Sequence, residues 1–323
     1  MVEIIPYLTL FGGLAYLLLG GDLLVRGAIG FSRRAGISPM LAGLTIVAVG
    51  TSAPELMVSM YSALSGFPAI ALGNVIGSNV ANVLLVLGVP VLIAPINCAE
   101  PGIRAQGLFM LAVTVLFIGF CSFGELTRVH GLFLLGLLVA GTWLALRGQF
   151  SMPGIDSEEA QEQLTLELGI PQESWEIALL STLGIVMLPL GADLTVDGSV
   201  EIAGSLGVPE AVIGASMVAI GTSLPELSTT VIAAFHRSAG VALGNVIGSN
   251  VLNILGIMGA TATVTAIPVA AGFLALDVWV MLAAALLLTG CMLRGVTLGR
   301  AAGGLMLLAY GAYMIAIFQR TGY

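Results

Sequence analysis

The sequence predicts an all-α integral membrane protein of ten transmembrane helices, arranged as two inverted five-helix repeats with helices broken at mid-membrane. Of its 323 residues, 58% are hydrophobic and only 9% are charged, too few charges to cover a soluble fold. Apolar runs of about 20 residues, each long enough to cross a bilayer, recur along the chain. Long stretches of the first half also return in the second half. A transmembrane β-barrel would alternate polar and apolar residues, which this chain does not do.

The apolar runs divide into five spans in each half of the chain. The expected spans are 4–20, 37–65, 69–94, 103–123, 128–147, 174–195, 208–235, 240–266, 272–291 and 297–318.

Two sequence blocks recur at an offset of 171 residues. "ALGNVIGSNV" at 71–80 is identical to 242–251, and "VAVGTSAPEL" at 47–56 matches "VAIGTSLPEL" at 218–227. Two matching blocks in one register indicate an internal repeat. Because each copy has an odd number of spans, the second copy enters the membrane from the opposite side, so the repeat is inverted. The expected organisation is a first repeat at 1–147 (motif 45–88), an acidic cytoplasmic linker at 148–173, and a second repeat at 174–323 (motif 216–259).

The arginines predict the orientation in the membrane. Positive residues favour cytoplasmic loops, and with the N-terminus outside, eight of the ten arginines fall on the cytoplasmic side. We therefore expect a multi-pass protein of the plasma (inner) membrane with both termini outside. The eight arginines are Arg26, Arg33, Arg34, Arg104, Arg147, Arg237, Arg294 and Arg300.

Composition excludes several functions. The chain has no lysine and no basic patch for nucleic acid, and its three cysteines show no metal or disulfide spacing. The glycine-rich motifs are not phosphate loops, since no strand precedes them and no lysine follows. We expect no cofactor, no enzymatic activity and no obligatory protein partner.

The "TSAPE" motif predicts a broken helix lined with oxygen atoms. Pro54 lacks an N–H, so the carbonyl of Gly50 loses its helical donor. Free carbonyls inside a membrane are tolerated only where they face protein, water or an ion. Hydroxyls and a carboxylate stand at the same depth, and the second copy repeats them. These residues are Thr51, Ser52 and Glu55, with Thr222, Ser223 and Glu226 in the copy.

The "GNVIGSN" motif brings amides to the same depth. Glu55 lies about 12 residues before the turn at 66–68, and Asn79 and Asn82 lie about 11–14 residues after it, so both groups are about 18 Å from the turn in antiparallel helices. Inverted symmetry places the two resulting clusters face to face. The residues expected level with the glutamates are Ser78, Asn79 and Asn82, and Ser249, Asn250 and Asn253 in the copy.

Carboxylates, amides, hydroxyls and free carbonyls together favour a hard cation, calcium or sodium, over zinc, copper or iron. A purely structural role for the serines and asparagines is the alternative to ion binding. Serine and asparagine often serve only as hydrogen-bonding links between membrane helices, and this is the main expectation for Asn74 and Asn245. A carboxylate inside the membrane is costly. Two of them, each in its own copy of the same kinked motif, indicate function.

"GTSAPE" with "GNVIGSNVAN", and "GTSLPE" with "GNVIGSNVLN", resemble the α-repeats of the sodium/calcium exchanger family within the cation/calcium antiporters, in a compact prokaryotic form. The resemblance covers essentially the whole chain and implies alternating access and calcium extrusion driven by sodium entry. It implies calcium ligation by Glu55 and Glu226 with the backbone of Thr51 and Thr222. For sodium it implies Ser52, Ser223, Ser78, Ser249, Asn82, Asn253 and the carbonyls of Ala48 and Ala219. Many members carry Asp at one of the positions that Asn82 and Asn253 occupy here.

The leading hypothesis is a sodium/calcium antiporter whose partners are the two ions and the lipid bilayer. A proton/calcium antiporter using the same glutamates is the main alternative. A channel, an intramembrane enzyme using the glutamate pair, and a structural scaffold are further alternatives, of which the enzyme lacks a nucleophile–base pair.

Overall fold

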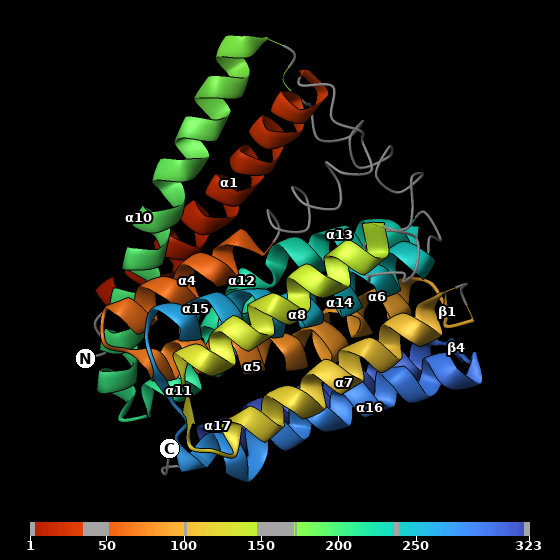
Figure 1. Ribbon diagram of the computed structural model, residues 1–323. Helices are drawn as coiled ribbons and strands as arrows, with labels where there is room; N and C mark the ends of the chain where they lie inside the picture. Colours follow the sequence, from red (N-terminus) through yellow and green to blue (C-terminus); the bar gives the residue numbers. More distant parts are fainter. Residues whose placement is uncertain are drawn as a thin grey trace.

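A computed structural model describes residues 4–34, 52–99, 102–146, 171, 173–235 and 239–319. Nearly all of them are helical (Figure 1). The elements of the first repeat are α1 (Ile5–Arg34), α4 (Ala53–Leu64), α5 (Pro68–Ala81), the π-helical turn η2 (Asn82–Val86), α6 (Gly88–Ile93), β1 (Ile96–Asn97), α7 (Ile103–Cys121), β2 (Glu125–Leu126) and α8 (Arg128–Leu146). Those of the second repeat are α10 (Ser174–Leu206), α11 (Glu210–Ile213), η3 (Gly214–Val218), α12 (Ala219–Thr222), α13 (Leu224–Phe235), α14 (Ala239–Leu252), η4 (Asn253–Met258), α15 (Gly259–Val264), β3 (Ile267–Pro268), η5 (Phe273–Asp277), α16 (Val278–Arg294), β4 (Thr297–Leu298) and α17 (Arg300–Phe318).

The described residues contain seven helices long and apolar enough to cross a membrane, and an eighth if the bent pair Glu210–Thr222 and Leu224–Phe235 counts as one span. The two other predicted spans appear as α4, which covers the second half of 37–65, and as the shorter apolar helix of α8. The linker at 148–173 falls almost wholly outside the described residues.

The helices that carry the "GNVIGSN" motif form the centre of the molecule. In the most apolar 18-residue window, 78% of the residues are buried in both Pro68–Ile93 and Ala239–Val264, against 33% in Ile5–Leu24 and 28% in Arg300–Phe318. A helix apolar on all sides is stable when it is surrounded by other helices. The outer faces of the molecule therefore belong to the other spans.

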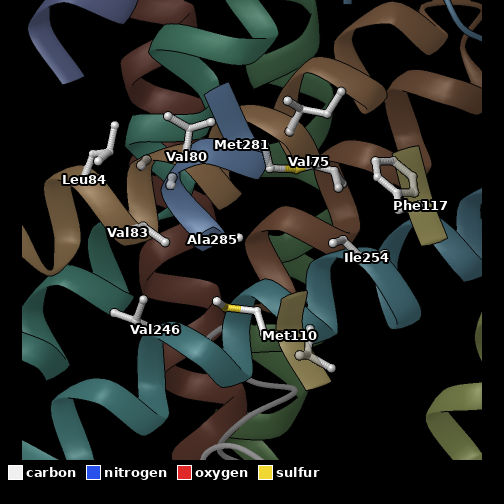
Figure 2. Close-up of a cluster of buried hydrophobic side chains, with 14 of the residues drawn as sticks. Val75, Val80, Val83, Leu84, Met110, Phe117, Val246, Ile254, Met281 and Ala285 are labelled. Atoms are coloured by element: carbon white, nitrogen blue, oxygen red, sulfur yellow. The ribbon is translucent and has the colours of Figure 1, made fainter. Parts of the chain in front are cut away.

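Apolar side chains from both repeats hold these central helices in place. Figure 2 shows Val75 and Val80 of α5 in one cluster with Met110 of α7, Ile254 of η4 and Met281 of α16. All five are at most 2% exposed. The packing fixes the positions of α5 and α14, on which the polar motif residues lie.

Two pairs of short strands tie the ends of the spans together. β1 pairs antiparallel with β4, and β2 pairs antiparallel with β3. Each pair joins one repeat to the other, and the 171-residue offset relates β1 to β3. The sequence analysis did not predict these strands.

The first and sixth spans are longer than predicted. We expected 4–20 and 174–195, but α1 has 30 residues and α10 has 33. Hydropathy ends the first span early because of Asp22 and Arg26, yet these side chains form an i,i+4 ion pair at 2.9 Å that is compatible with a continuous helix. α10 also continues past Pro189.

Glycines spaced by seven residues bring α1 and α10 into close contact. A Cβ on Gly13 would stand 2.5 Å from the backbone nitrogen of Thr195, and one on Gly191 would stand 2.9 Å from the carbonyl oxygen of Gly13. Small residues allow membrane helices to approach at their backbones. The two helices therefore form a pair, which projects from the body of the molecule in Figure 1.

This pair contacts the two repeats unequally. α10 packs along α4, and Tyr61 Oη of α4 donates a short hydrogen bond to Asp193 Oδ1 of α10. Among the described residues, no comparable packing joins α1 to α13. The sequence shares this asymmetry, because Ile232 stands at the repeat position of Tyr61 and cannot form the equivalent hydrogen bond with Asp22.

At the motif glycines Gly73 and Gly77, α5 approaches the second repeat closely. A Cβ on Gly73 would stand 2.7 Å from the carbonyl oxygen of Ala211, and one on Gly77 would stand 2.5 Å from that of Ala215. From the other side, a Cβ on Gly214 would stand 2.8 Å from the carbonyl oxygen of Ile70. The backbones of α5 and the α11–η3 segment are therefore in direct contact.

We expect Gly77→Ala to lower the melting temperature of the detergent-purified protein, because the new methyl group collides with rigid backbone and such overpacking costs about 1–3 kcal/mol. Thermal unfolding followed by intrinsic fluorescence measures the change. Gly136→Ala is the control, since a Cβ on Gly136 in α8 has nothing within 4 Å and alanine favours helix. Equal melting temperatures for the two variants would contradict the proposed contact.

Candidate cation-binding site

The predicted helix break is confirmed in the second repeat, and both repeats carry a glutamate near the start of a half-helix. The residues before Ser52, where the first break is expected, lie outside the described residues. α4 begins at Ala53, with Pro54 near its N-terminus and Glu55 in its first turn. In the second repeat α12 ends at Thr222, and α13 carries Glu226 in its first turn. The two segments around that break are bent by 45°. Proline fits the first turn of a helix because the N–H it lacks has no helical acceptor there.

The carboxylates of Glu55 and Glu226 lie close to each other. Each also lies beside residues at the helix break of the opposite repeat. Glu55 and Glu226 are close enough to interact electrostatically, and Thr222 and Ser223 lie beside the Glu55 carboxylate. Ser52 Oγ is 3.4 Å from Glu226 Oε1 and donates to it. Each glutamate is thus surrounded by hydroxyls that its own repeat does not supply.

The amides of the two "GNVIGSN" copies meet in the same core. Asn82 Nδ2 donates to Asn250 Oδ1 over 3.1 Å, and Asn250 Nδ2 donates to the carbonyl oxygen of Asn79 over 3.4 Å. Asn82 and Asn253 each begin a π-helical turn, η2 and η4. Such turns often occur at functional sites, and here the same residue of each repeat begins one.

The predicted site residues that the structure describes are all buried, with none more than 7% exposed. They are Glu55, Glu226, Asn82, Asn253, Thr222, Ser52, Ser223, Ser78, Ser249 and Ala219. Thr51 and Ala48 lie outside the described residues.

Many of the oxygen atoms in this core have no hydrogen-bond partner among the described residues. A buried polar atom without a partner costs about 1–3 kcal/mol, so such a concentration in one place requires an explanation. A cation, which binds oxygen lone pairs, would supply it. The oxygen atoms are Glu55 Oε2, Ser78 Oγ, Asn79 Oδ1, Asn82 Oδ1, Ser223 Oγ and Asn253 Oδ1.

The Ala219 carbonyl is less available than expected. It accepts hydrogen bonds from Ser223 N at 3.1 Å and from Thr222 Oγ1 at 3.4 Å. The break after α12 is tight at this point, because the chain continues directly into α13. An ion at this carbonyl would share it with both donors.

The donor set agrees with hard-cation chemistry. Two carboxylates with neutral oxygens suit calcium or sodium, and the absence of soft donors in the cluster argues against zinc or copper.

The sequence analysis missed one buried carboxylate. Asp277, in the span expected at 272–291, is 0% exposed and accepts a hydrogen bond of 2.8 Å from Tyr313 Oη. A charged residue inside an apolar span was the available signal. Tyr313 lies on α17, outside the glutamate cluster.

An oxygen-lined core between two inverted repeats of membrane helices, at the point where helices are broken, is the arrangement of a secondary cation transporter. The chain matches the family model described as sodium/calcium exchanger protein over residues 5–147 and 176–319. It therefore belongs to the sodium/calcium exchanger family, whose members are transporters and not enzymes.

Individual relatives agree along the full length. The chain is 36% identical to the protein named CaxA of Alkalimonas amylolytica, with 95% of this chain and 97% of the relative covered. It is 33% identical to the sodium/calcium exchanger MaX1 of Methanosarcina acetivorans, with 97% and 99% covered. A solved structure of the sodium-calcium exchanger NCX_Mj, soaked with 10 mM Na+ and 10 mM Sr2+, matches with a TM-score of 0.64 at 29% identity and covers 98% of this chain and 99% of that one.

We expect Ser78→Ala to leave the melting temperature of the ion-free protein unchanged or higher, because the Ser78 hydroxyl is buried without a partner among the described residues. The matched control is Ser216→Ala in η3, whose hydroxyl donates to the carbonyl of Val212 over 2.6 Å. That variant should lose about 1 kcal/mol. Unfolding in chelator and sodium-free buffer measures both, and a larger loss for Ser78→Ala would show that its hydroxyl is already satisfied by protein.

Proposed function

We propose that this protein exchanges sodium for calcium across the membrane by alternating access, with calcium bound between Glu55 and Glu226. The observation that carries the proposal is the meeting of these two carboxylates, one from each repeat, among buried oxygens that lack partners in the described structure. Two glutamates balance the charge of one calcium ion.

The remaining ligands follow from the same cluster. We assign the backbone of Thr51 and Thr222 to calcium with the glutamates. Sodium accepts neutral oxygens and takes the hydroxyls, amides and carbonyls around them. These are Ser52, Ser223, Ser78, Ser249, Asn82, Asn253 and the carbonyls of Ala48 and Ala219. The similarity of this chain to the sodium/calcium exchanger MaX1 and the sodium-calcium exchanger NCX_Mj supports this pair of ions.

The unequal packing of α1 and α10 supports alternating access. α10 packs along α4, and the described part of α1 does not pack comparably on α13. Movement of the α1–α10 pair relative to the central helices would exchange these contacts and open the site on the other side. The arginine distribution supports a plasma (inner) membrane protein with both termini outside.

Proton/calcium exchange is the second candidate, and the closeness of the two glutamates favours it. Two carboxylates in contact in a buried site do not both ionise easily, so one of them could carry a proton in place of sodium. The same residues would then bind calcium, and only the driving ion would differ.

Calcium uptake into inside-out vesicles separates the two candidates. We expect 45Ca2+ uptake to follow an imposed outward sodium gradient and to be insensitive to a proton gradient of equal size. Vesicles lacking the protein are the control. Uptake that follows the proton gradient alone would refute sodium as the driving ion, and uptake without any countergradient would indicate a channel.

We expect Glu55→Gln and Glu226→Gln each to reduce calcium flux to the level of empty vesicles, because each removes half of the anionic charge of the site. Vesicle uptake measures the flux, and immunoblotting of the membrane fraction measures insertion. The control is Glu125→Gln in β2, an exposed glutamate outside the cluster, which should transport like the unmodified protein. Normal flux in either site variant would remove that glutamate from the set of ligands.

A further inference from the structure

Two buried or half-buried asparagines occupy the same place in the two repeats, and the ion-ligand set does not include them. Asn74 lies in α5 and is 0% exposed. Asn245 lies in α14 and is half-buried. The 171-residue offset relates them, and the sequence analysis expected them to serve as links between helices.

Each asparagine fastens the first turn of a glutamate-bearing half-helix. Asn74 Nδ2 donates to the backbone carbonyl of Glu55 at 3.3 Å and to Ser59 Oγ at 3.0 Å. Asn245 Nδ2 donates to the carbonyl of Glu226 at 3.1 Å and to Thr230 Oγ1 at 2.9 Å. Both contacts recur in both repeats, although the hydroxyl comes from serine in one and from threonine in the other.

Asn74 also reaches the opposite repeat. Its Oδ1 accepts a hydrogen bond of 3.2 Å from Thr222 Oγ1. Thr222 is the last residue of α12, immediately before the second helix break. One amide thus joins the turn that carries Glu55 to the broken helix end that lies beside the Glu55 carboxylate.

We propose that Asn74 and Asn245 are positioning residues, which fix each glutamate relative to the rest of the ion site and so set its affinity for calcium. An amide suits this role, because Asn74 donates from Nδ2 to two acceptors and accepts at Oδ1 from one donor. Replacing Asn74 by aspartate would remove the two donated hydrogen bonds, and replacing it by alanine would remove all three. The inference rests on the proposed function in taking Glu55 and Glu226 as calcium ligands.

A purely structural link predicts a different result. An asparagine that only ties α4 to α5 would, when removed, lower the stability of the protein without changing its affinity for ions. A positioning residue changes the calcium affinity of the protein that remains folded. The two roles therefore separate when stability and affinity are measured in the same titration.

The experiment is thermal unfolding of the full chain in detergent across a series of calcium chloride concentrations, with no ion gradient. We expect Asn74→Ala and Asn245→Ala each to raise the calcium concentration at half-maximal stabilisation about tenfold, as expected for the loss of one or two hydrogen bonds. Thr289→Ala is the matched control, because Thr289 Oγ1 also makes a buried link between helices, to the carbonyl of Gly107 at 3.0 Å. It should lower the melting temperature and leave the calcium midpoint unchanged.

The proposal is overturned if Asn74→Ala lowers the melting temperature as Thr289→Ala does but leaves the calcium midpoint within twofold of the original. If Asn74→Ala does not fold, Asn74→Ser, which supplies one hydroxyl in place of the amide, replaces it and should give a smaller rise in the midpoint. An unchanged midpoint in that variant overturns the proposal equally.

A double-mutant cycle tests the link between repeats. Thr222→Val removes the hydroxyl and keeps the backbone carbonyl assigned to calcium. We expect its effect on the calcium midpoint to be much smaller when Asn74 is already alanine, because the two side chains act through one hydrogen bond. Additive effects would overturn this part of the proposal.

The outcome of the calcium titration does not depend on whether sodium or protons drive the exchange. If vesicle uptake follows protons and not sodium, the calcium titration still reports whether the asparagines position the glutamates. If calcium does not stabilise the unmodified protein at all, both the calcium site and the positioning role fail.

Discussion

Two carboxylates from opposite repeats meet in a core that is almost closed to solvent, and the rest of the structure is arranged around that meeting. Glu55 and Glu226 are at most 1% exposed and interact with each other. Like charges at such a site repel, and burial removes the water that would screen them. The helix breaks, the hydroxyls of Ser52 and Thr222 and the surrounding amides make the arrangement possible, and a divalent cation between the carboxylates would complete it.

The fold was largely predictable because the two halves of the sequence share long matching blocks in one register. The copied blocks predicted the inverted architecture, and the proline of the second copy predicted the helix break after Thr222. Helix ends were less predictable. Hydropathy ended the first span near residue 20, since it scores Asp22 and Arg26 as polar and cannot register that they neutralise each other in an ion pair.

The site was predictable as a set of residues and much less so as a set of contacts. Antiparallel spacing placed Asn82 at the depth of Glu55, but the hydrogen bond from Asn82 to Asn250 joins different repeats and depends on how they pack. For the same reason, the sequence predicted Asn74 as a link between helices but not its contact with Thr222 of the opposite repeat. The repeat gave no signal for Asp277. Its equivalent in the first repeat is Gln106, so no second carboxylate marks this position.

The contact between Tyr61 and Asp193 has a consequence for the energies of the transport cycle. In a perfectly duplicated chain, exchanging the conformations of the two repeats would turn one access state into another of equal free energy. This chain is not perfectly duplicated, because Ile232 stands at the repeat position of Tyr61, and Asp22 pairs with Arg26 within its own helix. Under the proposed alternating access, the hydrogen bond from Tyr61 to Asp193 would stabilise one access state without a counterpart in the other, and the sequence itself would favour that state.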